Sequence, residues 1–469
     1  MRLKSIFTNS FGILFSRVTG LFRDVLMASA LGASIWSDMF FVAFKLPNLF
    51  RRIFAEGAFT QAFMPSFIAS RHKGVFAVSI FMRFMLFLGA FSFIISLYPA
   101  PITKLLAWGW DTKLISDTAT LTAINFWYLD LIFVVTFLAT LLQYKEHFAT
   151  TALSTALLNI SMISALWLYM HHSPKEVAYA LSFAVVIGGV LQVVAHLIAI
   201  RKFRLDRLLV GGVKYKNKKD IKEEESKFNS LFIPGIIGNS TPQISAFIDT
   251  ILASFLLSGS ISYLFYANRV FQLPLAIFAI ATSTALFPSI SKAIKNNQQT
   301  QAYQHLKKAF WFLLFLLSFA MIGGMILAEP IIWLLFERGK FTITQTHQSM
   351  FVLQMYMIGL IPFGLAKLFS MFLYASHKHK KAAKFAIYSL IASVSSSLVL
   401  MHYLQAAGLA LAGSIGGWVL FYFTTKEIGF DRLKEILKDR YLIYYIVGMV
   451  VFSGLMYGVN IYLVDWIRA

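Results

Sequence analysis

Charged residues stand inside stretches of this sequence that are otherwise almost entirely apolar. The clearest case is FKLPNLFRRIFAEGAF, residues 44–59, which carries Lys45, Arg51, Arg52 and Glu56 between the flanks DMFFVAF and TQAFMPSFI. An ionised group at the centre of a membrane costs roughly 2.5–3.5 kcal/mol on insertion scales, so such residues are expected to face a wet interior rather than lipid. The stretch therefore predicts a polar cavity enclosed by helices.

Most of the charges of this kind are cationic. Those within or at the start of apolar segments are Arg17, Arg23, Asp24, Asp38, Lys45, Arg51, Arg52, Glu56, Arg83, Asp130, Asp249, Arg269 and Lys367. A guanidinium group binds phosphate oxygens through two parallel hydrogen bonds, so a cavity rich in arginine suits a phosphate-bearing anion. The alternative is that the charges pair structurally or snorkel to lipid headgroups, as Arg83 and Lys367 could do.

Asp249 is a lone carboxylate with a different potential role. It follows NSTPQIS, whose side-chain and backbone oxygens beside Pro242 could help to bind a hard cation such as sodium, or Asp249 could carry a proton. The eleventh predicted span, KKAAKFAIYSLIASVSSSLVLM, has no carboxylate to complete the site. The chain lacks cysteine, and HH at 171–172 and HKH at 377–379 are more typical of solvated loops. We therefore expect no metal and no organic cofactor.

The elements that must position these residues are membrane-spanning helices. The 469 residues are 58% hydrophobic and 13% charged, far more apolar than a soluble domain requires. A helix needs roughly 20 mostly apolar residues to span the hydrocarbon core. Thirteen segments qualify, at 9–32, 35–69, 75–99, 119–143, 149–170, 177–200, 229–257, 261–290, 309–336, 348–375, 383–403, 405–424 and 441–464. Their length and lack of strict alternation predict an all-α polytopic membrane protein rather than a barrel.

Lysine and arginine collect in alternate loops. The loops rich in lysine and arginine are 71–73, Lys145, 201–227, 292–308, 377–384 and 426–440. The loops between them, GASIWSD, HHSPKE, LLSGSI and MHYLQAAG, hold only Lys175. By the positive-inside rule the N-terminus is cytoplasmic, and an odd number of spans places the C-terminus outside. The net charge of +21 thus belongs to loops near anionic headgroups, and we expect no nucleic-acid partner.

A repeat divides the chain. DVLMAS from Asp24, FKLP at 44–47 and AFMPSFI at 62–68 recur in order as DTILAS from Asp249, FQLP at 271–274 and ALFPSIS at 285–291. Six spans separate the copies, so both enter the membrane from the same side and form a parallel repeat. We expect two six-helix lobes around a central cavity, with helix breaks at Pro47, Gly57, Pro65, Pro274 and Pro288. The predicted parts are a lobe at 1–205, a basic linker at 206–228, a second lobe at 229–425, and a loop with an additional helix at 426–469.

Enzymatic chemistry has little support in the sequence. No GxxxxGK[ST] motif occurs, and no Ser/His/Asp arrangement stands out. A membrane enzyme acting on a polyprenyl phosphate would need clustered carboxylates for metal or acid–base work, but the acids within spans are scattered and outnumbered by arginine. A transporter that is not an enzyme is the prediction, and the polyprenyl-phosphate enzyme is the alternative from another class.

The segment SRVTGLFRDVLMASALGASIWSDMFFVAFKLPNLFRRIFAEGAFTQAFMP, residues 16–65, closely resembles the N-terminal signature of the MurJ (MviN) lipid II flippases. These belong to the multidrug/oligosaccharidyl-lipid/polysaccharide (MOP) exporter superfamily. SGSISYLFYANRVFQLPLAIFAIATSTALFPSIS, residues 258–291, extends the resemblance into the second lobe. It implies a multi-pass protein of the bacterial inner membrane that carries lipid II, the undecaprenyl-diphosphate-linked peptidoglycan precursor, to the outer leaflet by alternating access.

The resemblance also implies which residues bind substrate. The family's cavity arginines fall on Arg17, Arg23, Arg51 and Arg269, and its motif acids on Asp24, Asp38 and Glu56, with Arg52 expected to pair with Glu56. Some members use acids of the seventh and eleventh helices for sodium; only Asp249 matches, which favours the membrane potential over Na⁺ or H⁺ as the driving force. Members typically have fourteen helices, one more than counted here.

Expected partners are lipid II, membrane lipids and proteins of cell-wall synthesis. The nearest alternative to a lipid II flippase is an exporter of another lipid-linked oligosaccharide or of drugs. A drug exporter would favour an acidic or aromatic cavity over this excess of arginine.

Overall fold

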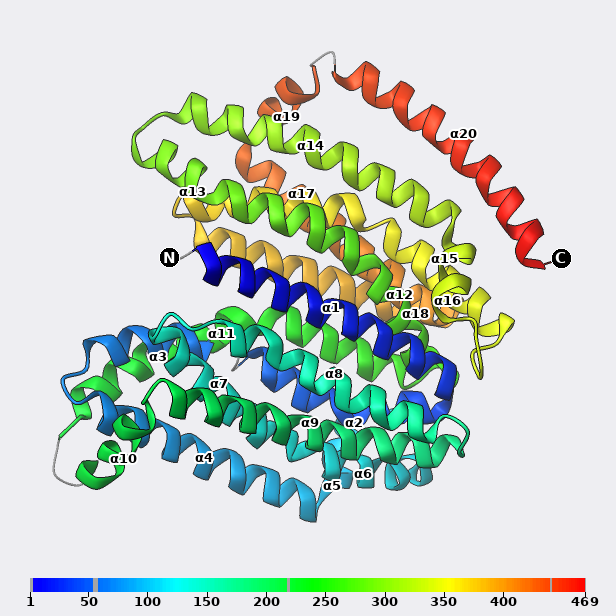
Figure 1. Cartoon of the computed structure of the whole chain (residues 1–469). Helices are drawn as coiled ribbons and strands as arrows, with labels where there is room; N and C mark the ends of the chain where they lie inside the picture. Colours follow the sequence, from blue (N-terminus) through cyan, green and yellow to red (C-terminus); the bar gives the residue numbers. More distant parts are fainter. Residues whose placement is uncertain (1–2, 54–57, 217–219, 439–440, 469) are drawn as a thin grey trace. The chain divides into compact units, whose positions relative to one another are not determined.

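The computed structural model describes residues 3–53, 58–216, 220–438 and 441–468 (Figure 1). These ranges contain helices and their connections and no strand. Since backbone polar groups in lipid must be satisfied within the protein, a polytopic chain this apolar forms helices. Nine helices within the described ranges are long and apolar enough to cross a membrane. The prediction of an all-α polytopic membrane protein is confirmed.

The contacts divide the chain into two units, Met1–Ile251 and Leu252–Ala469. The helices that begin in the first unit are α1 (Leu3–Leu31), α2 (Ile35–Ile53), α3 (Phe59–Ala69), α4 (Lys73–Leu97), α5 (Pro99–Leu106), α6 (Thr112–Phe126), α7 (Tyr128–Tyr144), α8 (Ala149–Tyr169), α9 (Pro174–Lys202), α10 (Asp206–Tyr215) and α11 (Lys222–Ala253). Those of the second are α12 (Ser260–Pro274), the π-helix η3 (Leu275–Ile280), α13 (Ala281–Lys295), α14 (Gln299–Ile326), α15 (Ala328–Phe336), α16 (Ile343–Met357), α17 (Leu360–Ala375), α18 (His379–Ile428), α19 (Phe430–Leu437) and α20 (Tyr441–Arg468). The predicted lobe boundaries stay a prediction.

Each of the thirteen predicted spans falls on helix. Several are built from two elements, such as α6 with α7 and α16 with α17. The eleventh and twelfth spans are the two halves of α18, which is interrupted at Gln405, where φ is 50° and ψ is −132°. A left-handed φ at a residue with a side chain is uncommon, and it reverses the chain here between two antiparallel segments.

The repeated motifs lie on corresponding elements. DVLMAS and DTILAS lie in the final turns of α1 and α11, and the two PS-containing motifs lie in α3 and α13. Pro47 lies within α2, whereas Pro274 ends α12 and is followed directly by η3. Proline removes a backbone donor, and π-helical turns are frequent at functional sites, so the FQLP copy marks a change from α-helix to π-helix within one continuous helix, Ser260–Lys295. Pro65 and Pro288 lie inside α3 and α13, so the expected breaks at these two prolines and at Pro47 are not found. Gly57 lies outside the described residues.

Aromatic side chains fill the core of the first unit. The Phe59 ring packs edge-on against Phe84, Phe133 and Phe228, with centroid separations of 5.4–5.9 Å. Edge-to-face pairs of this kind contribute roughly 0.5–1.5 kcal/mol each beyond their burial. Phe228 was placed in the predicted linker, but it is fully buried in this cluster and α11 already begins at Lys222. Its aromatic contacts explain why helix replaces linker there.

Helix α10 also lies in the predicted linker and packs against α4. The contact is a backbone approach between Gly74 and Gly212, where a Cβ on Gly212 would overlap the Gly74 carbonyl. Only glycine allows two helices to meet this closely. The linker is therefore partly a helix docked on the first unit.

Gly212→Val is expected to undock α10 and destabilise the protein by about 1–3 kcal/mol, the typical cost of overpacking a close contact. Gly211→Val is the matched control, because a Cβ at Gly211 would meet nothing within 4 Å. Thermal unfolding of the purified variants in detergent measures the difference. Equal unfolding midpoints for the two variants would contradict the glycine contact.

In the second unit, α20 packs along α14. Ser318 Oγ lies 2.9 Å from Tyr445 Oη, and the Phe319 and Phe452 ring centroids are 4.7 Å apart. The short helix α19 precedes α20, and the Trp311 indole N–H donates to the Ile436 carbonyl at 3.2 Å. These contacts hold the additional helix against the second unit, as Figure 1 shows for α14 and α20.

Candidate functional site

Arg23 and Asp24 form a buried ion pair near the end of α1. Arg23 is 8% exposed and Asp24 1% exposed. Arg23 Nε donates to Asp24 Oδ1 at 3.0 Å, and Arg23 Nη2 donates to the same oxygen at 2.6 Å. Removing two charges from water is costly, and the pair persists because the guanidinium and the carboxylate compensate each other directly. The structure therefore orients the Arg23 guanidinium by a neighbour in the sequence.

Asn159, at the midpoint of α8, completes this arrangement. Arg23 Nη1 donates to Asn159 Oδ1 at 3.0 Å. Asn159 Nδ2 in turn donates to the Ser16 carbonyl at 3.0 Å and lies 3.2 Å from Thr19 Oγ1. The carboxamide thus links α1 to α8 and fixes the Arg23 side chain from a second direction. Sequence reasoning missed Asn159; the available signal was a lone amide inside the apolar stretch ALLNISMI.

The other predicted residues of α1 and α2 have different surroundings. Arg17 is exposed on α1. Arg51 is half-buried at the end of α2, where its Nε donates to Asn48 Oδ1 at 3.2 Å. The Arg52 side chain and Glu56 lie outside the described residues, so their expected pairing stays a prediction. Asp38 is buried in the first turn of α2, where a carboxylate complements the positive end of the helix dipole.

Asp249, the predicted ion-site residue, interacts electrostatically with Lys45. The two residues come from α11 and α2 of the first unit. Asp249 is half-buried in α11, and its predicted role in binding sodium or a proton stays a prediction. The side chains of 239–242, which were expected to add oxygen ligands, are outside those the structure describes.

Arg269 lies on α12 in the second unit. It is half-buried, and its guanidinium carbon is 4.9 Å from the centroid of the Phe265 ring. Stacking on an aromatic face holds the guanidinium plane, and the N–H donors lie in that plane, the geometry that suits a two-point contact to phosphate oxygens. Arg269 stands five residues before Pro274, where α12 gives way to η3. The residue therefore lies close to the π-helical segment of this helix.

Two further charged residues within the predicted spans are placed by the structure. Arg83 lies 4.0 Å from the Glu225 carboxylate of α11, which agrees with the structural alternative for that residue. Asp130 is 8% exposed within α7. The structure thus separates the buried pair of Arg23 with Asp24 from Arg83, whose side chain is 43% exposed beside Glu225.

The chain is similar to a family of known transporters over nearly its whole length. A family model described as Lipid II flippase MurJ matches residues 27–468. The chain is 49% identical over 425 residues to a probable lipid II flippase MurJ of Helicobacter pylori (strain ATCC 700392 / 26695), covering 88% of this chain and 92% of that protein. It is 33% identical over 479 residues to a probable lipid II flippase MurJ of Buchnera aphidicola subsp. Acyrthosiphon pisum (strain APS), covering 97% and 90% of the two chains.

Solved structures agree with this similarity. One described as lipid II flippase MurJ in an inward closed conformation superposes with a TM-score of 0.79 at 25% identity, over 98% of this chain and 99% of that one. An inward-facing multidrug resistance MATE family transporter of the MOP superfamily superposes with a TM-score of 0.62 at 13% identity, over 94% and 97% of the two chains. The second likeness concerns the fold alone.

Proposed function

The chain belongs to the lipid II flippase MurJ family, and on this premise we propose that it moves lipid II from the inner to the outer leaflet of the bacterial cytoplasmic membrane by alternating access. The observation that carries the proposal is the 49% identity over 88% of the chain to a probable lipid II flippase. The TM-score of 0.79 to a MurJ structure supports the same conclusion. The protein is a transporter, and lipid II is its substrate.

The diphosphate of lipid II is the part of the substrate that arginine recognises. We assign its binding to Arg17, Arg23, Arg51 and Arg269, because guanidinium groups bind phosphate oxygens bidentately. Asp24 and Asn159 act as positioning residues, since they hold three of the Arg23 N–H groups in fixed directions. Asp38, Arg52 and Glu56 are assigned to the same cavity. The resemblance of residues 16–65 to the family's N-terminal signature supports this assignment for the first unit.

The driving force is the membrane potential in this proposal. Export of an anion is favoured by a potential that is negative inside, by about 2.3 kcal/mol per unit charge per 100 mV. The eleventh predicted span supports it, because it has no carboxylate to join Asp249 and a lone carboxylate supplies few of the oxygen ligands that a hard cation requires.

Replacing sodium by potassium on both sides of the membrane is expected to change the rate of lipid II exposure by less than about twofold, whereas dissipating the potential reduces it about tenfold or more. The measurement is made in cells or spheroplasts, with an ionophore chosen to collapse the potential while the sodium gradient is kept. A rate that follows sodium and ignores the potential would contradict this energy source.

The N-terminus is cytoplasmic in this proposal, supported by the distribution of Lys and Arg between alternate loops. Because the chain has no cysteine, a single cysteine introduced at Lys380 can report the side of the 376–378 turn. An impermeant maleimide added outside intact cells is expected to leave it unlabelled, whereas a cysteine at Lys175, in the first turn of α9, is labelled. The opposite pattern would invert the topology.

Depletion of the protein in its host tests the function. We expect depletion to reduce the fraction of lipid II that an externally added, membrane-impermeant hydrolase can cleave, and wild-type protein to restore it. The strain must lack a second flippase. Unchanged access would instead make another lipid-linked oligosaccharide the substrate, and a new polyprenyl-phosphate product seen by chromatography would indicate an enzyme.

A further inference from the structure

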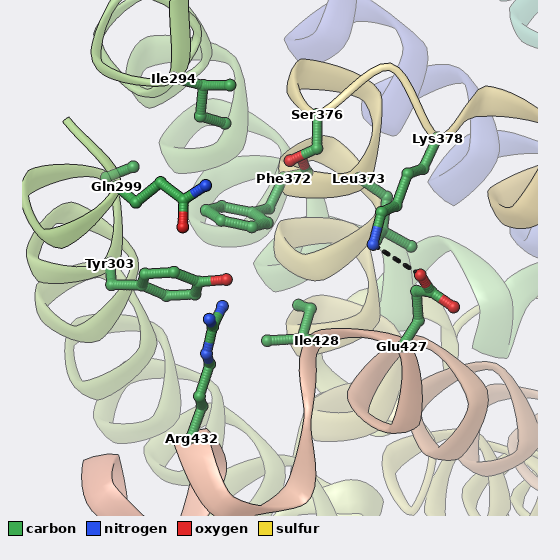
Figure 2. Close-up of a pocket in the computed structure, with 11 residues that line it drawn as sticks. Ile294, Gln299, Tyr303, Phe372, Leu373, Ser376, Lys378, Glu427, Ile428 and Arg432 are labelled. Atoms are coloured by element: carbon green, nitrogen blue, oxygen red, sulfur yellow. Dashed lines mark hydrogen bonds and ion pairs between the residues drawn. The ribbon is translucent and has the colours of Figure 1, made fainter. Parts of the chain in front are cut away.

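A polar pocket of about 500 Å³ lies in the second unit, and its lining includes none of the residues assigned to lipid II (Figure 2). It is formed where the ends of α13, α14, α17, α18 and α19 meet. Its polar lining consists of Gln299, Tyr303, Ser376, Lys378, Glu427 and Arg432. These residues include part of the basic segment HKHKKAAK at 377–384, which the transport cavity does not use.

Cations outnumber anions at this pocket. Lys378 Nζ lies 2.7 Å from Glu427 Oε1, and Lys381 Nζ lies 2.8 Å from the same oxygen. The two ammonium groups therefore share one carboxylate, and Arg432 adds a third positive charge. Lys378, Glu427 and Arg432 line the pocket, whereas Lys381 pairs with Glu427 from outside the lining, so the charges at the pocket sum to a positive excess.

Arg432 is held in a fixed plane at the pocket. Its guanidinium carbon lies 3.8 Å from the centroid of the Tyr303 ring. In Figure 2 the guanidinium extends from α19 toward the space between Tyr303 and Phe372, with the Gln299 amide above. A stacked guanidinium loses little freedom on binding, and its fork matches two phosphate oxygens. Lys378 on the opposite side of the pocket supplies a point charge.

The fold explains why residues far apart in sequence meet here. Because α18 reverses at Gln405, its first turn and its last turn lie together, and Glu427 meets Lys378 and Lys381 across 49 and 46 residues of chain. Phe372, Leu373 and Ile428 add an apolar wall beside these charges. Basic pockets between membrane helices commonly accept anionic headgroups.

We propose that this pocket binds an anionic phosphate group, carried either by a phospholipid headgroup or by a soluble phosphate ester. The Arg432 guanidinium donates two hydrogen bonds to the phosphate, and Lys378 adds a positive charge from α18. Tyr303 and Gln299 offer hydrogen bonds from α14. A bound phosphate ties α14, α18 and α19 together at the base of α20. The proposal stands independently of the lipid II function.

The test uses the purified full-length chain in non-ionic detergent and native mass spectrometry. The protein is titrated with phosphatidylglycerol, phosphatidylcholine or glycerol 3-phosphate. Phosphatidylglycerol binding without glycerol 3-phosphate binding identifies the lipid as the source, and the reverse identifies a soluble ester. In either case we expect Arg432→Gln to weaken binding by about tenfold or more, and Lys378→Gln to weaken it less.

Lys434→Gln is the matched control, because it removes the same charge from α19 at a side chain that is 72% exposed and outside the pocket. It is expected to change affinity by less than about twofold. Arg432→Lys keeps the charge but loses the planar pair of hydrogen-bond donors. Its affinity for the probe should lie between those of the wild type and Arg432→Gln. Equal affinities of Arg432→Gln and Lys434→Gln, equal binding of phosphatidylcholine and phosphatidylglycerol, or no binding of any probe would overturn the proposal.

Discussion

Arg23→Ala is expected to destabilise the protein by about 3–5 kcal/mol, because removing one partner of a buried ion pair leaves the other charge uncompensated. Asp24 is 1% exposed and accepts two hydrogen bonds from Arg23, so the substitution removes a direct partner of a carboxylate that lies away from water. Thermal unfolding of purified protein in detergent measures the effect. Arg17→Ala, an exposed arginine on the same helix, should unfold like wild type.

A double variant separates the structural role of Arg23 from its role in transport. In Arg23→Met with Asp24→Asn no buried charge is left unpaired, so most of the lost stability should return. Lipid II exposure should stay low, because no guanidinium remains to bind the diphosphate. If the double variant recovers both stability and exposure, Arg23 holds the fold together and does not bind the substrate.

Arg269→Ala is expected to reduce lipid II exposure by about tenfold or more while leaving the unfolding midpoint close to wild type, since one charge-assisted hydrogen bond to substrate is worth roughly 1.5–3 kcal/mol. The residue is half-buried and stacked on Phe265, so its removal deletes little packing. The measurement is the cleavable fraction of lipid II in depleted cells expressing the variant at the wild-type level.

Two controls sharpen this prediction. Arg338→Ala removes an exposed arginine between α15 and α16 of the same unit and should retain full exposure of lipid II. Arg269→Lys retains charge but not the planar fork, and an intermediate rate is expected. Wild-type exposure from Arg269→Ala would show that the second unit binds the diphosphate through other residues.

The helical architecture followed from the sequence because lipid imposes a simple rule. Thirteen long apolar stretches could become only helices, and hydropathy located each of them. The docking of α10 and the early start of α11 did not follow, since they depend on contacts of Gly212 and Phe228 with residues more than a hundred positions away. Composition near 206–228 indicates only a polar, charged stretch.

The types of residue at the site could be predicted from the sequence, but the contacts between them could not. In-span charges identified Arg23 and Asp24 as functional candidates, yet neighbours in a helix do not normally face each other, so their direct pairing was not expected. Asn159 was not predicted, because it carries no charge and the candidate residues were charged ones.

Reconstitution of the purified chain into vesicles with fluorescent lipid II tests the central claim most directly. With an inside-negative potential imposed, the fraction of lipid II accessible to an impermeant quencher outside should rise in vesicles containing wild-type protein. It should remain at the protein-free level in vesicles containing Arg269→Ala. Equal accessibility in wild-type, variant and protein-free vesicles would contradict the assignment of this chain as a lipid II flippase.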